Sequence, residues 1–411
     1  MSSRTVGDYL KIESGFAFKS KDWRENGNKV VKIANIHDHF ADMSECSFIS
    51  DEVAKGAKRF IANYHDIIVC LTGATLGEIG RLVEHEQVFI NQRVGLARSK
   101  NPVLNDFSYY LLRYVKSVIV ALGAGSAQEN ISPMDIEKIE VPEFDVHDAE
   151  RIGMFLSNFD LIIEHGNSLL NNLDSVLELI YKYWFNNQTP PDSIDLTELA
   201  TAFGMPMSEF QEVEAPIEFT KSLLGNIAFI DSKSINPFDD PEKIFRHYSI
   251  PAFDNSRTPA LDSGSQIKSG KYLVPEKSIL VSKLNPITPR KWLVLDSTSN
   301  SICSTEFVIL KPKKDFQLSY IYYLLKSPAV QSEMVSIGIG STGSRQRLIP
   351  DDLLRIEIDY PGDDLVKAFN NIALPILQLS QYLLDLNVKL SLLRDLCIPQ
   401  IYSGELILTL K

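Results

Sequence analysis

Two similar stretches, NISPMDIEKIEVPEF (Asn130–Phe144) and RLIPDDLLRIEIDYP (Arg347–Pro361), decide the architecture of this 411-residue chain. Pro350 lies 217 residues after Pro133, and the apolar residues that follow each proline coincide at the same shift. Further upstream, the string YYLL at 109–112 returns at 322–325, a shift of 213. The difference of four residues between the two shifts corresponds to a small loop insertion. An internal repeat of this length indicates two copies of one domain.

A heptad pattern of apolar residues follows each copy of the proline phrase. The first run comprises Phe155, Phe159, Ile162, Gly166, Leu169, Leu173, Val176, Ile180 and Tyr183, and the second comprises Ile372, Ile376, Leu379, Leu383, Leu386, Leu390, Leu393 and Cys397. Apolar residues at alternating steps of four and three form one stripe along a helix, as in a coiled coil. Each helix should run for about 35 residues, roughly 50 Å. Gly166 would let the two helices approach closely.

The sequence therefore predicts an α+β protein in which two globular domains alternate with two long helices. The predicted boundaries are 1–144 for the first domain, 145–216 for the first helix (about 148–185) and a linker, 217–361 for the second domain, and 362–411 for the second helix. The runs DIIVCL (Asp66–Leu71) and SILVSKL (Ser278–Leu284) are typical of buried strands.

The net charge of −12 argues at first against a nucleic-acid partner, because phosphate binding needs a basic face. The charge is uneven, however: 17 basic and 19 acidic residues in 1–144, 2 and 13 in 145–216, 18 and 16 in 217–360, and 4 and 5 in 361–411. The first helix and its linker thus carry −11, and the two globular segments are close to neutral. Such segments leave room for local basic patches.

The four cysteines, Cys46, Cys70, Cys303 and Cys397, are scattered, as expected for reduced core residues of a cytoplasmic protein. The first residues lack the apolar core of a signal peptide, and the most apolar stretch, 109–123, is too short to span a bilayer. We therefore expect a cytoplasmic protein with no membrane partner.

Catalytic motifs are mostly absent. The glycines of GATLGEIG (Gly73–Gly80) lack the lysine of a phosphate-binding loop, so a turn is favoured. His37-Asp38-His39 could form one edge of a metal site, but no third ligand lies at useful spacing, and a surface or structural role is favoured. Asp231-Ser232-Lys233, taken with Pro191-Asp192, loosely resembles a nuclease set, for which chance is the better explanation. The sequence predicts no catalytic residue, no metal and no cofactor in this chain.

Polar and basic residues instead gather in loops at matching places of the two domains. Arginine hydrogen-bonds guanine edges, asparagine and glutamine hydrogen-bond adenine edges, and lysine neutralises phosphates. The DNA-binding candidates are Asn91, Gln92, Arg93, Gln128 and Asn130 in the first domain, and Lys268, Lys271, Lys283, Arg290, Lys291, Arg345, Gln346 and Arg347 in the second. For each residue taken singly, an ordinary solvated loop is an equally good interpretation.

At this point the chain resembles the specificity subunits of type I restriction-modification systems. The strings that carry the resemblance are FINQRVGLARS (Phe89–Ser99), QENISPMDIEKIEVPEF (Gln128–Phe144), LIYKYWFNN (Leu179–Asn187) and LRDLCIPQIYSGEL (Leu393–Leu406). The duplicated order of these strings extends the resemblance over the whole chain. The second domain departs from the pattern, because NSICSTEFVIL (Asn300–Leu310) stands where an Asn-Gln-Arg-Val string would be expected.

The resemblance implies that each globular domain recognises one half of a bipartite site in double-stranded DNA. The two helices would pack antiparallel and set the distance between the halves, roughly 50 Å or about 15 base pairs. Two methyltransferase subunits, which use S-adenosylmethionine, would dock on the helices. Restriction and translocation subunits, which use ATP and Mg²⁺, would join them. The chain itself would carry no chemistry.

Two other classes of function stay open from the residues alone. The chain could be a single-chain nuclease or methyltransferase, for which Asp231-Ser232-Lys233 is the main sequence support. It could also be a coiled-coil scaffold or adaptor, which the helices and the acidic total would suit. A specificity subunit of a related restriction or methylation system is the nearest variant of the first hypothesis.

Overall fold

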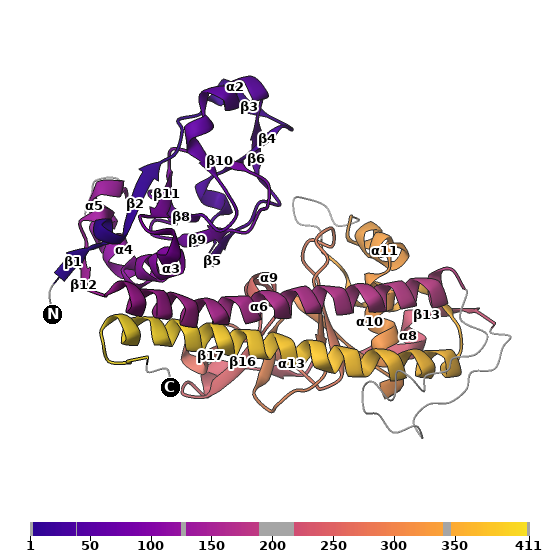
Figure 1. Ribbon diagram of the computed structural model, residues 1–411. Coiled ribbons are helices and arrows are strands. Elements are labelled where there is room, and N and C mark those ends of the chain that lie inside the picture. Colours follow the sequence, from indigo (N-terminus) through magenta and orange to yellow (C-terminus); the bar gives the residue numbers. More distant parts are fainter. Residues whose placement is uncertain (1–2, 38, 125–128, 189–217, 340–346, 409–411) are drawn as a thin grey trace. The chain divides into compact units, whose positions relative to one another are not determined.

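The computed structural model describes residues 3–37, 39–124, 129–188, 218–339 and 347–408 (Figure 1). These residues form two compact units. The first comprises 1–164 together with 389–411, and the second comprises 165–388. Each unit contains one globular domain and a segment of each long helix. The sequence-predicted domain boundaries stay a prediction, since the units divide the chain by contacts rather than by repeat.

The first unit contains three sheets. A two-stranded ribbon pairs β1 (Ser3–Thr5) with β12 (Glu140–Pro142). One five-stranded sheet has the order β3 (Trp23–Arg24), β6 (Ser47–Ile49), β4 (Asn28–Val31), β10 (Val88–Ile90) and β7 (Ile61–Ala62). The other has the order β2 (Leu10–Ser14), β11 (Val94–Ser99), β8 (Ile67–Cys70), β9 (Ile79–Leu82) and β5 (His39–Ala41).

The second unit repeats this plan. A ribbon pairs β13 (Thr220–Leu223) with β23 (Glu357–Tyr360). One sheet has the order β15 (Ser234–Ile235), β18 (Lys271–Leu273), β21 (Ser301–Ser304), β16 (Ile244–Tyr248) and β17 (Ala260–Ser263). The other has the order β14 (Ala228–Ile230), β22 (Phe307–Pro312), β19 (Ser278–Ser282) and β20 (Lys291–Val294).

Short helices connect the strands at matching places. In the first unit they are α1 (Val6–Tyr9), α2 (Asp51–Gly56), α3 (Asn105–Tyr114), α4 (Lys116–Ala124) and α5 (Pro133–Glu137). In the second they are α8 (Leu224–Ile227), α9 (Ile250–Ser256), α10 (Leu318–Lys326), α11 (Pro328–Ile339) and α12 (Pro350–Leu354). The predicted mixture of strands and helices is confirmed.

The strand pairings confirm the internal repeat independently of the sequence. The order β2-β11-β8-β9 matches β14-β22-β19-β20, and β6-β4-β10-β7 matches β17-β16-β21-β18. In both domains the central pair of the second set, β4 with β10 and β16 with β21, is parallel, whereas its neighbours are antiparallel. One topology is therefore built twice.

The core of each domain is one fully buried central strand covered by an aromatic helix. Every residue of β8 and of β19 is buried, as the runs at 66–71 and 278–284 predicted. Tyr109 and Tyr110 of α3, and Tyr323 of α10, are almost inaccessible to solvent. The predicted turn at Gly73–Gly80 is also confirmed, since Gly73 and Gly77 adopt the left-handed backbone conformation that favours glycine.

The two long helices are α6 (Val146–Tyr181) and α13 (Asp363–Tyr402). A carboxylate oxygen of Asp145 accepts from the backbone N–H of Asp148 (2.9 Å), which caps the start of α6 and lowers the pKa of Asp145. Gly404, in a left-handed conformation, follows the end of α13. The predicted first helix thus begins two residues earlier than expected, and residues 182–186 continue it as a π-helical turn.

The helices run antiparallel within each unit (Figure 1). In the first unit Asp160 of α6 pairs with Arg394 of α13. In the second, Asn167 accepts a hydrogen bond from Asn387 at 2.9 Å. The predicted close approach at Gly166 is confirmed, because a Cβ there would lie 2.6 Å from the side-chain oxygen of Asn387.

The predicted apolar stripe is only partly the contact face of the helices. Ile372 and Ile376 are buried, and Phe155, Phe159, Leu173, Ile180, Leu383, Leu386 and Leu390 are half-buried. Six members of the stripe are 36–57% exposed, which corrects the prediction for them: Ile162, Leu169, Val176, Tyr183, Leu379 and Leu393. Gly166 of the predicted run is buried, and so are Leu156 and Leu177, which lie outside the run and belong to the apolar cores of the first and the second unit. A polar contact residue such as Asn387 does not appear in an apolar pattern.

Candidate nucleic-acid interface

The candidates Asn91, Gln92 and Arg93 form the tight turn between β10 and β11. The backbone N–H of Asn91 donates to the carbonyl of Val31 (3.1 Å), and that of Gln92 donates to the carbonyl of Phe16 (2.9 Å). The Asn91 side-chain oxygen accepts from the backbone of Arg93 at 3.2 Å. The side chains of Gln92 and Arg93 are exposed. The turn is therefore fixed through its backbone, and two side chains are left available to a ligand.

Asn130 lies close to this turn, one strand away. The backbone N–H of Ile131 donates to the carbonyl of Leu71 (2.9 Å), and the N–H of Leu71 donates to the carbonyl of Arg93 (3.0 Å). Asn130 and Arg93 thus flank the end of β8 on its two sides. Gln128 lies outside the described residues.

The second domain contains the same ladder with different side chains. The N–H of Leu348 donates to the carbonyl of Lys283 (2.8 Å), and the N–H of Lys283 donates to the carbonyl of Glu306 (2.7 Å). By strand register, Lys283 corresponds to Leu71, Glu306 to Arg93, and Arg347 to Asn130. Two of the candidates at this point, Arg345 and Gln346, fall outside the described residues.

The charges at this point are inverted between the domains. Arg347 makes a bidentate ion pair with Glu306, both contacts at 2.8 Å, and the arginine side chain stays 52% exposed. In the first domain the cation stands on the turn, as Arg93, and the residue corresponding to Arg347 is the neutral Asn130. The two domains therefore present different hydrogen-bonding groups on the same backbone frame, as expected of surfaces that recognise different base sequences.

Most of the other basic candidates of the second domain have structural partners, Lys268 being the exception among the described residues. Arg290 is held by both carboxylate oxygens of Asp254 at 2.6 and 2.9 Å. Lys283 donates to the carbonyl of Thr305 (2.7 Å), and burial lowers its pKa. Lys268 is exposed in the loop before β18.

Lys271 and Lys291 are buried, with 7% and 8% of their surface accessible, so the structure does not present them to a phosphate backbone. Lys271 donates to Ser269, and Lys291 to the side chain of Gln331. Burial lowers the pKa of both lysines, that of Lys291 to about 8. The sequence does not distinguish such lysines from exposed ones, because the strands that they begin, β18 and β20, show no clean alternation of apolar and polar residues.

Sequence reasoning missed Glu306 and Asp254, the acidic partners of the arginines. Glu306 lies within the string Asn300–Leu310 that replaces the expected Asn-Gln-Arg-Val. That departure was the available signal, since it marked a place where the second domain carries different side chains. No sequence signal pointed to Asp254, which is 36 residues from Arg290.

The structure gives little support to a nuclease set. Asp231 and Lys233 line a shallow hollow of ≈ 430 Å³ together with Glu276, and Asp192 lies outside the described residues. Within the described parts of the chain, no three histidine, cysteine or acidic residues are grouped so that they could hold a metal ion. His39 lies in a polar network with Tyr109, Arg113 and Arg394, in keeping with the structural role favoured for it.

The long helices carry a second candidate surface, made of exposed apolar side chains. In the first unit it includes Ile162, Leu393 and Leu396, and in the second unit Leu379, Val176 and Leu179. In the 217-residue repeat, Ile162 is equivalent to Leu379, Val176 to Leu393, and Leu179 to Leu396. The repeat therefore places one equivalent apolar patch in each unit, of the kind that marks a protein interface.

None of the helices formed by the described residues combines the length and apolarity that a membrane span requires.

The chain was compared with known proteins. Residues 1–174 match the family described as the type I restriction modification DNA specificity domain. Two relatives come from Methanocaldococcus jannaschii. The specificity subunit of the type I restriction enzyme MjaVIII is 26% identical over 164 residues, 38% of this chain and 39% of that subunit. The specificity subunit of MjaIX is 20% identical over 334 residues, 75% of this chain and 70% of that subunit.

Among solved structures, the S subunit of a type I restriction-modification system from M. genitalium superimposes with a TM-score of 0.57 at 15% identity, covering 99% of this chain and 96% of that one. At this identity the likeness shows a shared fold. The α+β architecture with two long helices is thus the architecture of a known S subunit.

Proposed function

We propose that this chain, which belongs to the family of type I restriction-modification specificity subunits, selects the DNA sequence on which such a complex acts. The observation that carries the proposal is the duplicated domain: one topology is built twice, with different side chains at the same exposed turn. A protein that recognises a two-part DNA sequence needs two such surfaces, one for each half.

In the first domain the reading groups are Gln92, Arg93 and Asn130, and in the second Arg347 with Glu306. Arginine suits a guanine edge, and asparagine or glutamine an adenine edge. A glutamate carboxylate accepts a hydrogen bond from a cytosine amino group. These chemical differences would give the two halves of the site different sequences.

The helix surface supports the docking of two identical partners. Leu179 is 53% exposed and Leu396, its repeat equivalent, is 64% exposed. Two equivalent patches on one chain suit two copies of one subunit. We infer that these copies are methyltransferase subunits that bind S-adenosylmethionine and methylate adenine. Restriction subunits that use ATP and Mg²⁺ would complete the assembly, the chain itself contributing no catalytic group. A cytoplasmic location stays a prediction.

Methylation mapping tests the reading function. The methyltransferase partner is expressed with this chain or with a different specificity subunit, and methylated adenines are mapped over the same plasmid library. We expect a two-part methylated sequence that changes when the chain is exchanged. A methylated sequence that does not depend on the chain would contradict the proposal and favour a scaffold.

Docking is tested on the apolar patches. Leu179→Asp and Leu396→Asp should each remove one of two methyltransferase copies, and the double variant both, because a carboxylate opposes burial in an apolar interface. The mass of the purified complex gives the copy number. Exposed Asn171→Asp on the same helix is the matched control, since it adds charge outside the patch. Two copies bound to the double variant would contradict this assignment.

A further inference from the structure

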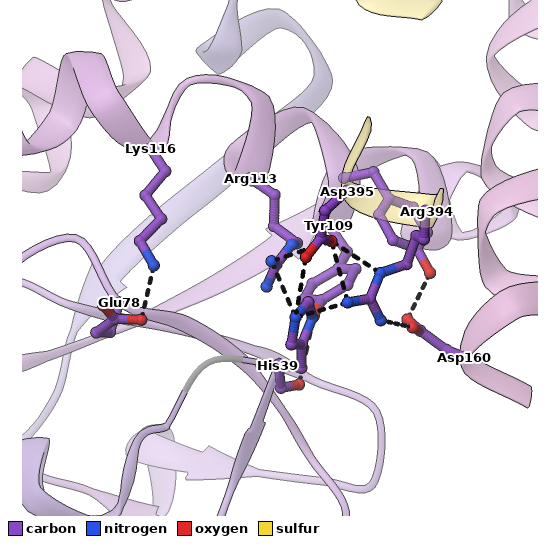
Figure 2. A network of polar contacts seen from close by, with 9 residues as sticks. His39, Glu78, Tyr109, Arg113, Lys116, Asp160, Arg394 and Asp395 are labelled. Carbon is purple, nitrogen blue, oxygen red and sulfur yellow. Dashed lines mark hydrogen bonds and ion pairs between the residues drawn. The ribbon is translucent and has the colours of Figure 1, made fainter. Parts of the chain in front are cut away.

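A network of polar side chains joins the first recognition domain to the long helices (Figure 2). Tyr110 of α3 donates to Asp160 of α6 at 2.5 Å, and the other oxygen of Asp160 pairs with Arg394 of α13. Arg394 also contacts Asp395 at 3.0 Å and is only 2% exposed. Arg394, at the centre of the network, therefore lies in the interior of the first unit.

His39 completes this network from the sheet. Two guanidinium groups, those of Arg113 (3.1 Å) and Arg394 (2.6 Å), point at its Nε2 atom. Arginine has only donors, so Nε2 must accept, and the ring proton lies on Nδ1 beside the hydroxyl of Tyr109 (3.4 Å). Tyr109 in turn donates to the backbone carbonyl of His39 (3.3 Å). Each contact is directional, and together they fix the domain at one angle on its helices.

The second unit has a similar junction, in which the tyrosine, the cation and one of the two carboxylates occupy repeat-equivalent positions, whereas Asp174 has no acidic equivalent in the first unit. Tyr323 of α10 donates to Asp174 of α6 at 3.0 Å. Lys326 contacts Asp174 at 2.6 Å and Glu178 at 2.7 Å. The shift of 213 converts Tyr110 to Tyr323 and Arg113 to Lys326.

The shift of 217 converts Glu178 to Asp395. The ion pair between Arg113 and Asp395 (3.6 Å) in the first unit therefore has its counterpart in Lys326 and Glu178. In both units a tyrosine and a cation one turn later, on the helix that covers the sheet, face carboxylates on the long helices. Because this arrangement of tyrosine, cation and carboxylates occurs in both units, we expect it to have the same role in both domains.

We propose that these two junctions determine how many base pairs the complex accepts between the halves of its site. The inference rests on the proposed function. Successive base pairs are 3.4 Å apart, and about ten complete a turn. A small rotation or shift of one globular domain would therefore align it with a half-site that lies one base pair nearer or farther. Apolar packing is non-directional and would tolerate such movement, whereas directional hydrogen bonds that involve charged groups do not. Tyr110, Arg113, Tyr323 and Lys326 are thus positioning residues.

The test compares spacer preference in the assembled complex. The half-site sequences are first mapped with the unaltered chain and its methyltransferase partner. Substrates then carry both halves with the native spacer, with one base pair fewer, or with one more. Arg113→Met and Lys326→Met are each expected to raise methylation of the altered spacers, relative to the native one, by about tenfold. The bases preferred within each half should stay unchanged.

Lys116→Met is the matched control. Lys116 pairs with Glu78 at 2.8 Å, which joins α4 to the β8–β9 turn inside the recognition domain (Figure 2). Removing this cation breaks an ion pair close to Arg113 in the chain but leaves the helix junction intact. Spacer preference should not change.

Two milder variants keep the test decisive if a methionine variant fails to assemble. Tyr110→Phe and Tyr323→Phe remove one hydrogen bond each and should relax spacer preference in the same direction by a smaller factor. A native spacer preference in both the methionine and the phenylalanine variants would overturn the inference. The proposed function fails differently, because the methylated bases would then not depend on the chain at all.

Discussion

The two globular domains have the same backbone topology but carry different charges on the exposed turn beside the end of the central strand. In each domain backbone hydrogen bonds join three segments: the first residues of the proline phrase, the end of the buried central strand (β8 or β19), and the turn that precedes β11 or β22. The first domain carries Arg93 and Asn130 on these segments, and the second carries Glu306 and Arg347. Backbone hydrogen bonds and the buried strand maintain the fold in both, so the exposed side chains are free to vary. The comparison separates what builds the domain from what it recognises.

The largest expected effect concerns the junctions with the helices. Arg394→Met removes a fully buried cation and leaves Asp160 without its ionic partner, which should cost about 3–5 kcal/mol of unfolding free energy. Lys326→Met in the second unit should cost less, about 1–2 kcal/mol, because Asp174 and Glu178 are about half exposed and can be solvated. Urea unfolding of the two variants measures the difference. Equal losses of unfolding free energy in the two variants would show that the deeper burial of Arg394 does not make its ion pair more important for stability.

The next effect concerns recognition by the two arginines. Arg347→Ala should weaken selection in one half of the methylated sequence by about 1–3 kcal/mol, and Arg93→Ala should do so in the other half only. Methylation of a library with randomised half-sites measures both. Arg98→Ala, an exposed arginine engaged with Asp66, serves as the control. Loss in both halves from a single variant would contradict the assignment of one reader to each half.

A third effect follows from the buried Lys291, whose strand-equivalent position in the first domain is Ile79. Burial lowers the pKa of Lys291 from 10.5 to about 8. Between these values the unfolded chain binds more protons than the folded one, so folding stability rises with pH from about 8 to 10.5 and is lowest below 8.

Lys291→Ile should remove this pH dependence. At pH 7 it should raise the unfolding free energy by about 1–2 kcal/mol, because a charged group is no longer buried. Unfolding in urea at pH 7 and pH 10 measures the change. The half-buried Gln331, which now accepts from Lys291, limits the gain. A variant that is less stable at pH 7 than the unaltered chain would show that this hydrogen bond outweighs burial of the charge.

The smallest effect on stability concerns Glu306. The ion pair with Arg347 is partly exposed, so Glu306→Gln should change the unfolding free energy by less than about 1 kcal/mol. It should nevertheless release Arg347 and steepen the decline of DNA affinity with salt. Glu242→Gln removes the same charge from an exposed loop of the same domain and is the control. Identical salt slopes for the two variants would show that Glu306 does not restrain Arg347.

Much of the fold could be predicted from the sequence, because apolar runs and repeats report burial directly. The shift between Pro133 and Pro350 revealed the internal repeat, and the runs at 66–71 and 278–284 identified the buried central strands. The heptad pattern located both helices. It identified their contact face only in part: Gly166 was in the pattern, whereas Asn387, which packs against Gly166, is polar and was not.

The candidate site was harder to predict, because long-range pairing decides which cations are available. From the sequence, Lys291, Arg290 and Arg347 are equally good candidates for basic loop residues that bind DNA. The structure buries the first and pairs the other two with acids that are 36 and 41 residues away. Such pairs depend on strand register, which a single sequence does not display.

The two-stranded ribbons β1–β12 and β13–β23 have a consequence for the evolution of such chains. Ser3 pairs with Pro142, and Thr220 pairs with Tyr360, so each domain begins and ends on two neighbouring strands immediately before a long helix. A segment whose two ends meet can be replaced as a cassette without disturbing what it is attached to. Recombination between genes at these two points would exchange one domain in a single event and leave the long helices unaltered; under the proposed function this would change one half of the recognised DNA sequence.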